Sequence, residues 1–128
     1  MDQVTEIRRG DLVLVPFPYV TDFFNKAKTR PVLVVQNDTG NRFASTVIVA
    51  LISSSIPQKR YPMHYPVLYP SAVAKAAGLS KASVVKMETL VTLPKHAILK
   101  RLGALPRGAM REVDQALAFS LDLPLAIP

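Results

Sequence analysis

Short apolar runs, separated by prolines and polar clusters, divide the first half of the chain into strand-like segments. Residues 12–15 are all apolar and end at Pro16-Phe17-Pro18, which predicts a first strand. Residues 32–36 follow Pro31 and predict a second strand, with Arg30 held just before it. Residues 46–52 are almost wholly apolar and predict a third strand that is covered on both faces.

The segments that follow the second and third predicted strands predict a turn, an edge strand and a short helix. Residues 37–41 are rich in turn formers and predict a turn. Residues 63–68 contain a proline and predict an edge strand. Residues 71–77 predict a short helix that Ser71 caps and Gly78 closes in a left-handed conformation.

The last third of the chain predicts one more strand and a final helix. Residues 83–93 return to a strand pattern. In residues 107–121 apolar side chains recur at helical spacing, which predicts an amphipathic helix covering a sheet. The basic run at residues 95–111 is interpreted as a solvated face or a polyanion-binding face. The chain therefore predicts a single, mainly β (α+β) domain over residues 1–128.

Composition narrows the class of protein. Half of the 128 residues are apolar (49%) and 20% are charged, which is typical of a globular domain. There is no cysteine, so a disulfide framework and a thiolate site are excluded. No apolar run approaches the ~18 residues of a membrane span, and the N-terminus lacks the apolar core of an export signal. We expect a cytoplasmic protein without a membrane partner.

Charge points to a polyanionic partner. Sixteen Lys and Arg against nine Asp and Glu give a net charge of +7, which favours nucleic acid, although a merely basic surface is the alternative. Residues 19–28 predict a loop in which Phe23 and Phe24 lie near Lys26 and Lys28. Aromatic and basic residues together are typical of single-stranded nucleic acid binders, but the two phenylalanines could equally pack into the core.

Several catalytic classes are poorly supported. Two histidines, no cysteine and no acidic cluster with ligand spacing argue against a metal site, and the scattered glycines form no phosphate loop. No Gly-x-Ser-x-Gly elbow is present. The remaining candidates for catalysis are an arginine before one predicted strand and serine hydroxyls after another. These could assist attack of an RNA 2′-hydroxyl on its own phosphate, because the substrate supplies the nucleophile and no cofactor is needed.

The order and spacing of four motifs resemble the MazF/PemK (Kid) toxins of type II toxin-antitoxin systems, in particular a PemK-like subgroup. The motifs are Arg9-Gly10-Asp11, Arg30-Pro31-Val32-Leu33-Val34-Val35-Gln36-Asn37-Asp38, Gly40-Asn41-Arg42-Phe43 and Thr46-Val47-Ile48-Val49-Ala50. The resemblance implies an SH3-like, partly open β-barrel of the MazF/Kid/CcdB type with a C-terminal helix. It also implies a homodimeric mRNA interferase, which is a metal-independent endoribonuclease leaving 2′,3′-cyclic phosphate and 5′-hydroxyl ends.

The resemblance also implies site residues. The family's catalytic arginine falls on Arg30, and its catalytic threonine falls on Ser53, which keeps the hydroxyl but loses the methyl that restricts χ1. Thr89 stands where many relatives have glutamine, and the loop 19–29 departs from the commoner type, so the cleavage sequence is not transferred. The residues expected to bind RNA are Lys26, Lys28, Asn37, Ser54, His64, Glu88 and Thr89.

Two other functions remain open from the sequence. A CcdB-like toxin would use the same barrel to poison DNA gyrase, and a non-catalytic module would bind RNA in a salt-dependent way without cutting it. The resemblance further implies an acidic MazE/PemI-like antitoxin, whose charge would complement the +7 surface.

Overall fold

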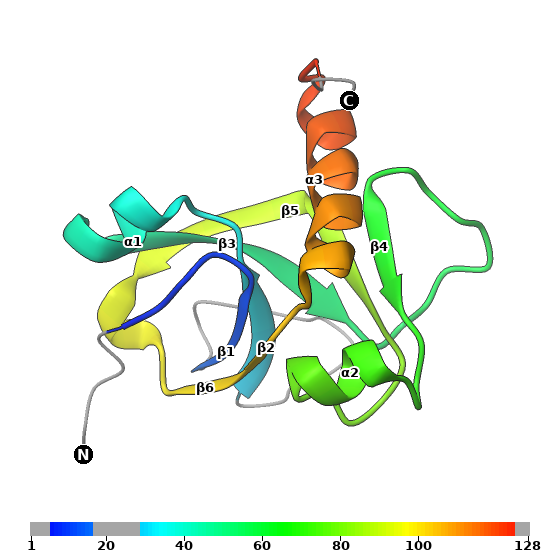
Figure 1. Cartoon of the computed structure of the whole chain (residues 1–128), viewed down its shortest axis with the longest axis horizontal. Coiled ribbons are helices and arrows are strands. Elements are labelled where there is room, and N and C mark those ends of the chain that lie inside the picture. The colour runs from blue at the N-terminus through cyan, green and yellow to red at the C-terminus, as the bar shows by residue number, and fades with distance from the viewer. Residues whose placement is uncertain (1–5, 17–28, 125–128) are drawn as a thin grey trace.

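A computed structural model describes residues 6–16 and 29–124 of the chain. Within these ranges six strands form one antiparallel sheet in the order β4-β5-β3-β2-β1-β6, curved into a half-barrel (Figure 1). The strands are β1 (Asp11–Pro16), β2 (Thr29–Val34), β3 (Thr46–Ser53), β4 (His64–Val67), β5 (Ser83–Pro94) and β6 (Lys100–Ala104). The helices are α1 (Asp38–Phe43), α2 (Ala72–Ala77), the 3₁₀ turn η1 (Lys95–Ala97) and α3 (Arg107–Leu121). The predicted mainly β class with a C-terminal helix is confirmed.

Most predicted elements are present. β4 is an edge strand as expected. The N-terminus of α2 is capped by the Ser71 side chain, which accepts from the Ala74 N–H, and Gly78 ends α2 with φ of 74°. The predicted final helix has the bounds of α3.

Three expectations were wrong. Arg30 lies inside β2, because the strand begins at Thr29. β3 is not covered on both faces, since Thr46 and Ile48 are exposed. The predicted turn at 37–41 is the capped start of α1. In the basic run 95–111 the side chains of Lys100, Arg101, Arg107 and Arg111 are exposed, as a solvated face requires. The run also contains β6, which was not predicted and which pairs with β1 although its own sequence is not markedly apolar.

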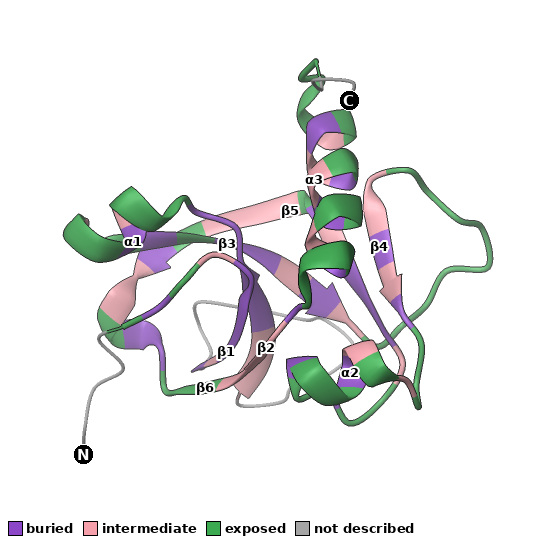
Figure 2. Ribbon diagram, viewed as in Figure 1, coloured by how far each residue is buried: buried purple, intermediate pink, exposed green. Residues whose placement is uncertain are grey.

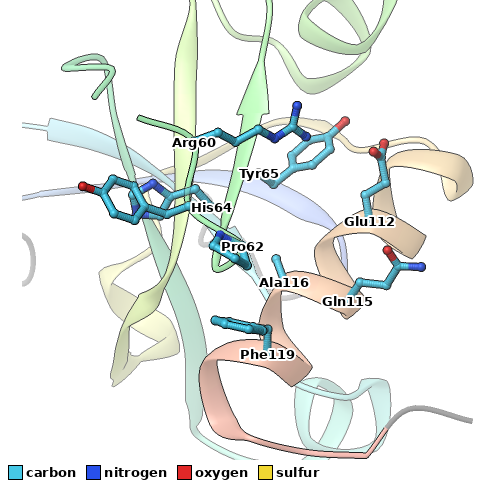
Figure 3. Close-up of a pocket in the computed structure, with 9 residues that line it drawn as sticks. Arg60, Pro62, His64, Tyr65, Glu112, Gln115, Ala116 and Phe119 are labelled. Atoms are coloured by element: carbon cyan, nitrogen blue, oxygen red, sulfur yellow. The ribbon is translucent and has the colours of Figure 1, made fainter. Parts of the chain in front are cut away.

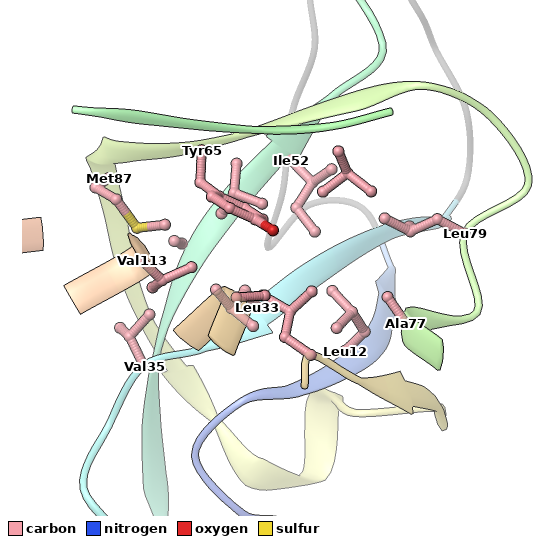
Figure 4. Packing of buried hydrophobic residues seen from close by; sticks show 14 of the residues in the cluster. Leu12, Leu33, Val35, Ile52, Tyr65, Ala77, Leu79, Met87 and Val113 are labelled. Carbon is pink, nitrogen blue, oxygen red and sulfur yellow. The ribbon is translucent and has the colours of Figure 1, made fainter. Parts of the chain in front are cut away.

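The sheet separates two apolar clusters. On one face Leu12, Leu33 and Met87 pack with Val113 of α3 (Figure 4). On the other face Val13 and Val32 belong to a cluster that also holds Val47, Val49, Leu93 and Ile98. The buried parts of β1 and β2 are drawn purple in Figure 2, and the apolar clusters on both faces fix the register of these two strands.

A network of internal polar bonds closes one end of β2 and β3. Gln36 donates to the side chain of Asn41 at 3.1 Å and to the carbonyl of Thr46 at 2.9 Å. Asn41 donates in turn to the carbonyl of Gln36 at 2.9 Å and to Asp38 at 3.1 Å. The Lys95 ammonium donates to the carbonyl of Asn41. We call this set, with Arg9 and Asn37, the closed end of the sheet.

Arg9 ties the closed end to α3. Its backbone N–H donates to Asp38 at 2.7 Å, and its guanidinium donates to the Val35 carbonyl at 2.9 Å and to Asp114 at 2.8 Å. The Arg9 hydrogen bond, followed by that from Asn41, lowers the pKa of Asp38 below its ordinary value. Arg9 of the Arg9-Gly10-Asp11 motif thus stabilises the folded structure.

None of the helices in the described ranges is both long and apolar enough to span a bilayer.

Candidate functional site

The register of the sheet brings Arg30 and Ser53 to one place. β2 and β3 pair Val34 with Val49, Leu33 with Ala50 and Val32 with Leu51. The paired residues end at Val32 and Leu51, and Arg30 and Ser53 each lie two residues further along their strands, towards the same end of the sheet. Opposed residues of an antiparallel pair place their side chains on the same face. Arg30 and Ser53 therefore share the face of Val32 and Leu51, at the end of the strands away from the closed end.

The Ser53 hydroxyl is held by a local turn. Its oxygen accepts the backbone N–H of Ser55 at 3.0 Å, so the hydroxyl hydrogen can still be donated to a substrate. This hydrogen bond fixes the position of the serine oxygen. In a threonine at this position, the methyl group would restrict the side-chain rotamer instead. Ser54, which follows, is exposed beside it.

His64 and Glu88 form a pair close to this face. The His64 Nε2 lies 2.8 Å from a Glu88 carboxylate oxygen, and the imidazole is only 8% exposed. Tyr61 packs edge-on against the ring with centroids 5.3 Å apart. The Nδ1 of His64 is buried and has no hydrogen-bond partner among the described residues. Because a carboxylate only accepts, Nε2 carries the proton, and a neutral ring then leaves Nδ1 as an acceptor.

An irregularity in β5 shapes this part of the sheet. Leu51 pairs with Lys86 whereas Ala50 pairs with Leu90, so three residues of β5, Glu88 and Thr89 among them, bulge between two ladder segments. Bulges of this kind often lie next to functional sites, where they redirect side chains. Glu88 is exposed at the bulge and Thr89 is half-buried.

Lys86 was missed from the sequence. It pairs with Leu51 on one side and with His64 on the other, so its side chain shares the face of Arg30 and Ser53. Its neighbours on the strand, Val85 and Met87, are both buried. A lysine between two apolar residues of a strand is the sequence pattern that could have identified Lys86 as a site residue. We call Arg30, Ser53, His64, Lys86 and Glu88 the open end of the sheet.

Not every predicted site residue joins the open end. Asn37 lies beyond the opposite end of β2, where its side chain accepts the Gly40 N–H at 2.8 Å and caps α1. Its placement in an RNA-binding set with Arg30 is therefore not supported. Lys26 and Lys28 lie outside the described residues, as do Phe23 and Phe24.

The open end is positively charged and lacks a metal-ligand cluster. Lys86 and Arg30 lie on its face, and the exposed loop before β4 adds Lys59 and Arg60. In the described part of the chain no three His, Cys, Asp or Glu side chains are grouped to hold a metal ion. This arrangement can bind phosphate oxygens and donate from a hydroxyl.

Comparison with known proteins assigns the family. Residues 8–121 match the model of the PemK-like, MazF-like toxins of type II toxin-antitoxin systems. The chain therefore belongs to this toxin family. It is also 38% identical over 117 residues to "Endoribonuclease MazF" of Staphylococcus epidermidis, covering 91% of this chain and 92% of that relative.

Solved structures of MazF proteins share the fold. A mycobacterial endoribonuclease in complex with its cognate antitoxin superimposes with a TM-score of 0.71 at 21% identity, covering 94% of this chain and all of that one. A chain of the MazE-MazF complex of Deinococcus radiodurans gives a TM-score of 0.65 at 22% identity, covering 92% of this chain and 97% of that one. The half-barrel of this MazF-like toxin is thus the fold of these structures.

Proposed function

We propose that this PemK/MazF-family toxin cleaves single-stranded RNA, mRNA in the cell, without a metal or cofactor. The observation that supports it most is the register of β2 and β3, which directs Arg30 and Ser53 to one face at the same end of the two strands, with Lys86 on the same face of β5. The Staphylococcus epidermidis relative bears the name of an endoribonuclease, which agrees with this chemistry. Arg30 and Ser53 are the proposed catalytic residues.

The reaction is an internal transfer within the RNA. The 2′-oxygen loses its proton and attacks the adjacent phosphorus, and the bond from phosphorus to the 5′-oxygen breaks. The departing 5′-oxygen takes up a proton from water, so that 2′,3′-cyclic phosphate and 5′-hydroxyl ends result. Arg30 presents a planar fork of donors to the phosphate oxygens, and Ser53 adds a neutral donor as negative charge develops.

The proton of the 2′-hydroxyl needs an acceptor other than arginine. An arginine side chain is a poor general base because its pKa is above ~12. Glu88 is exposed and lies beside His64, so it is placed to accept the proton directly or through water. Lys86 supports the developing charge, while Ser54, His64 and Thr89 flank the path of the RNA strand.

The partners follow from family membership and charge. We infer a homodimer and an acidic MazE/PemI-like antitoxin, as solved MazF structures include complexes with a cognate antitoxin. A net charge of +7 favours such a peptide on electrostatic grounds. The proposed location is the cytoplasm, where mRNA is found.

The deciding experiment uses purified protein, a long single-stranded RNA and EDTA, followed by mapping of both ends of each fragment. Cleavage at defined sites with cyclic phosphate and 5′-hydroxyl ends is expected. Binding without cleavage would instead indicate a non-catalytic RNA-binding module. Intact RNA together with inhibition of purified gyrase would indicate a gyrase poison, which the family model and the relatives described above do not favour.

A further inference from the structure

A contact between His64 and Glu88 links the edge strand β4 to the bulge of β5. His64 opposes Lys86 in the sheet, and both lie on the face of the open end. The imidazole Nε2 lies 2.8 Å from a carboxylate oxygen of Glu88. This contact brings the Glu88 carboxylate onto the same face.

The backbone of the bulge does not fix Glu88 by itself. Between Lys86 and Leu90 the pairing of β5 with β3 is interrupted, and Glu88 lies in this interruption. Its side chain is 40% exposed. An exposed carboxylate on an unpaired stretch samples several rotamers unless a neighbouring group holds it.

The His64 ring is a rigid neighbour with one proton to donate. Its side chain is more than nine-tenths buried, and Tyr61 packs edge-on against it. The Nδ1 is buried and has no partner among the described residues. A second proton at Nδ1 would leave a buried N–H without an acceptor, so the ring is neutral and its proton lies on Nε2, directed at Glu88.

A second carboxylate near His64, that of Glu112 in α3, does not compete for this proton. Glu112 and His64 both line a cavity of about 300 Å³ between α3 and the start of β4. In Figure 3 the Glu112 side chain lies beside Tyr65 and away from His64. Its charge, after burial as the larger cause, raises the pKa of Tyr65. In the described part of the chain, Glu88 is the carboxylate that pairs with the imidazole.

We propose that His64 is a positioning residue for the proton acceptor of RNA cleavage. Its Nε2–H holds one oxygen of Glu88, which leaves the other oxygen free to face the 2′-hydroxyl. This role rests on the proposed ribonuclease function. It assigns His64 an effect through Glu88 in place of a direct contact with RNA.

The spacing of the strands allows this arrangement. Lys86, at the edge of the bulge, pairs with Leu51, which lies two residues from Ser53. Two residues of a strand span about 7 Å. That separation leaves room for the ribose whose phosphate Ser53 contacts.

The proton transfers balance without a change at His64. The 2′-hydroxyl proton moves to the free oxygen of Glu88 as the 2′-oxygen bonds to phosphorus. The bond to the 5′-oxygen breaks, that oxygen takes a proton from water, and Glu88 then returns its proton to the hydroxide formed. His64 keeps its own proton and touches no reacting atom.

The test measures kcat and KM of the full-length protein on a short RNA with one mapped cleavage site. His64→Leu removes the donor and keeps an apolar side chain in the buried position, whereas His64→Gln keeps an N–H near the place of Nε2. Each change is also made together with Glu88→Gln. His96→Gln is the matched control, because His96 is exposed on η1 and lies outside the open end. Urea unfolding of every variant gives the folded fraction to which rates are normalised.

In His64→Leu, kcat should fall roughly ten- to hundredfold, as expected for loss of one hydrogen bond to a charged group, and KM should stay near that of the parent. His64→Gln should recover part of the rate. In the Glu88→Gln background His64→Leu should have no further effect, because a positioning residue acts only through the group that it holds. An equal loss in both backgrounds, an unchanged kcat, or a raised KM with the parent's kcat overturns the proposal.

A second measurement does not depend on activity. The nitrogen chemical shifts of the His64 imidazole, recorded by NMR without RNA, should show a proton on Nε2 and none on Nδ1, and a proton on Nδ1 overturns the proposal. If the parent cuts RNA and Glu88→Gln cuts it as fast, the ribonuclease function stands and the role of His64 is wrong. If the parent cuts no RNA, the ribonuclease function fails and the role of His64 fails with it.

Discussion

The two ends of β2 and β3 are both polar, but their side chains are used differently. At the closed end the amides of Gln36 and Asn41 are buried and bond to each other and to backbone carbonyls. At the open end the Ser53 hydroxyl keeps a hydrogen to donate, and the Nδ1 of buried His64 has no partner in the described ranges. Polar side chains that complete the fold satisfy one another, whereas those of a site retain bonding capacity for a ligand.

This difference predicts that mutations at the two ends have opposite profiles. Changes at the open end should reduce RNA cleavage with little effect on stability. Changes at the closed end should reduce stability and leave the activity of the folded fraction intact.

Arg30→Ala should give the largest loss of activity. Removal of a donor to the developing charge costs about 10²–10³-fold in rate, and the loss of a positive charge adds to this. Arg30→Lys should recover only part of the rate, because an ammonium lacks the fork geometry. Initial rates on a fluorogenic RNA, with urea unfolding as a control for stability, check both variants. Full activity in Arg30→Lys would contradict a role for two parallel hydrogen bonds.

Ser53→Ala should slow cleavage by roughly 10²-fold, since it removes one neutral donor. Ser53→Thr is the matched variant and should cut at least as fast as the parent, because it keeps the hydroxyl and restricts χ1. Single-turnover rates measure both. If Ser53→Ala matches the parent, Ser53 is not the counterpart of the family's catalytic threonine.

Asn41→Ala should lower the free energy of unfolding by about 1–3 kcal/mol, because it leaves the buried Gln36 carbonyl without its donor. The rate of RNA cleavage per folded molecule should stay unchanged. Urea unfolding followed by circular dichroism measures the stability. Thr39→Ala, an exposed change on the same helix, is the control.

Removing the charge of Asp38 should give the smallest effect, seen most clearly in how stability depends on pH in the acid range. Its pKa in the folded state is lowered from the ordinary 3.8, so its stabilising contribution is present above that pH. The contribution is lost as the pH falls through the folded-state pKa. Asp38→Asn should therefore lower stability slightly at pH 7 and flatten the loss of stability below about pH 4. Thermal unfolding across this range tests it, and parallel curves for parent and variant would refute the assignment.

Apolar patterning was sufficient to predict the sheet and the final helix, but not the polar segments. Asn37 and Asp38 favour turns and helix caps equally, because both conformations use a side-chain oxygen to accept a nearby N–H. Here the cap forms α1. β6 escaped prediction because pairing with β1 outweighs the weak strand preference of its basic sequence.

The site was predictable only in part for a similar reason. Arg30 and Ser53 could be identified by motif, although Arg30 lies within its strand rather than before it. Lys86 and the His64–Glu88 pair depend on which residues oppose one another across β3, β4 and β5. Such register is a property of the folded sheet and is not encoded by any one segment.

The pairing of β1 with β6 also has a consequence for the order in which the sheet is completed during synthesis. Arg30 and Ser53 leave the ribosome early, but Lys86 follows later, and β1 has one edge unpaired until Lys100–Ala104 has been made. Because N-terminal segments emerge first, the half-barrel cannot close before the last third of the chain is translated. We therefore expect a nascent chain to leave the message from which it is translated uncut until synthesis is almost complete.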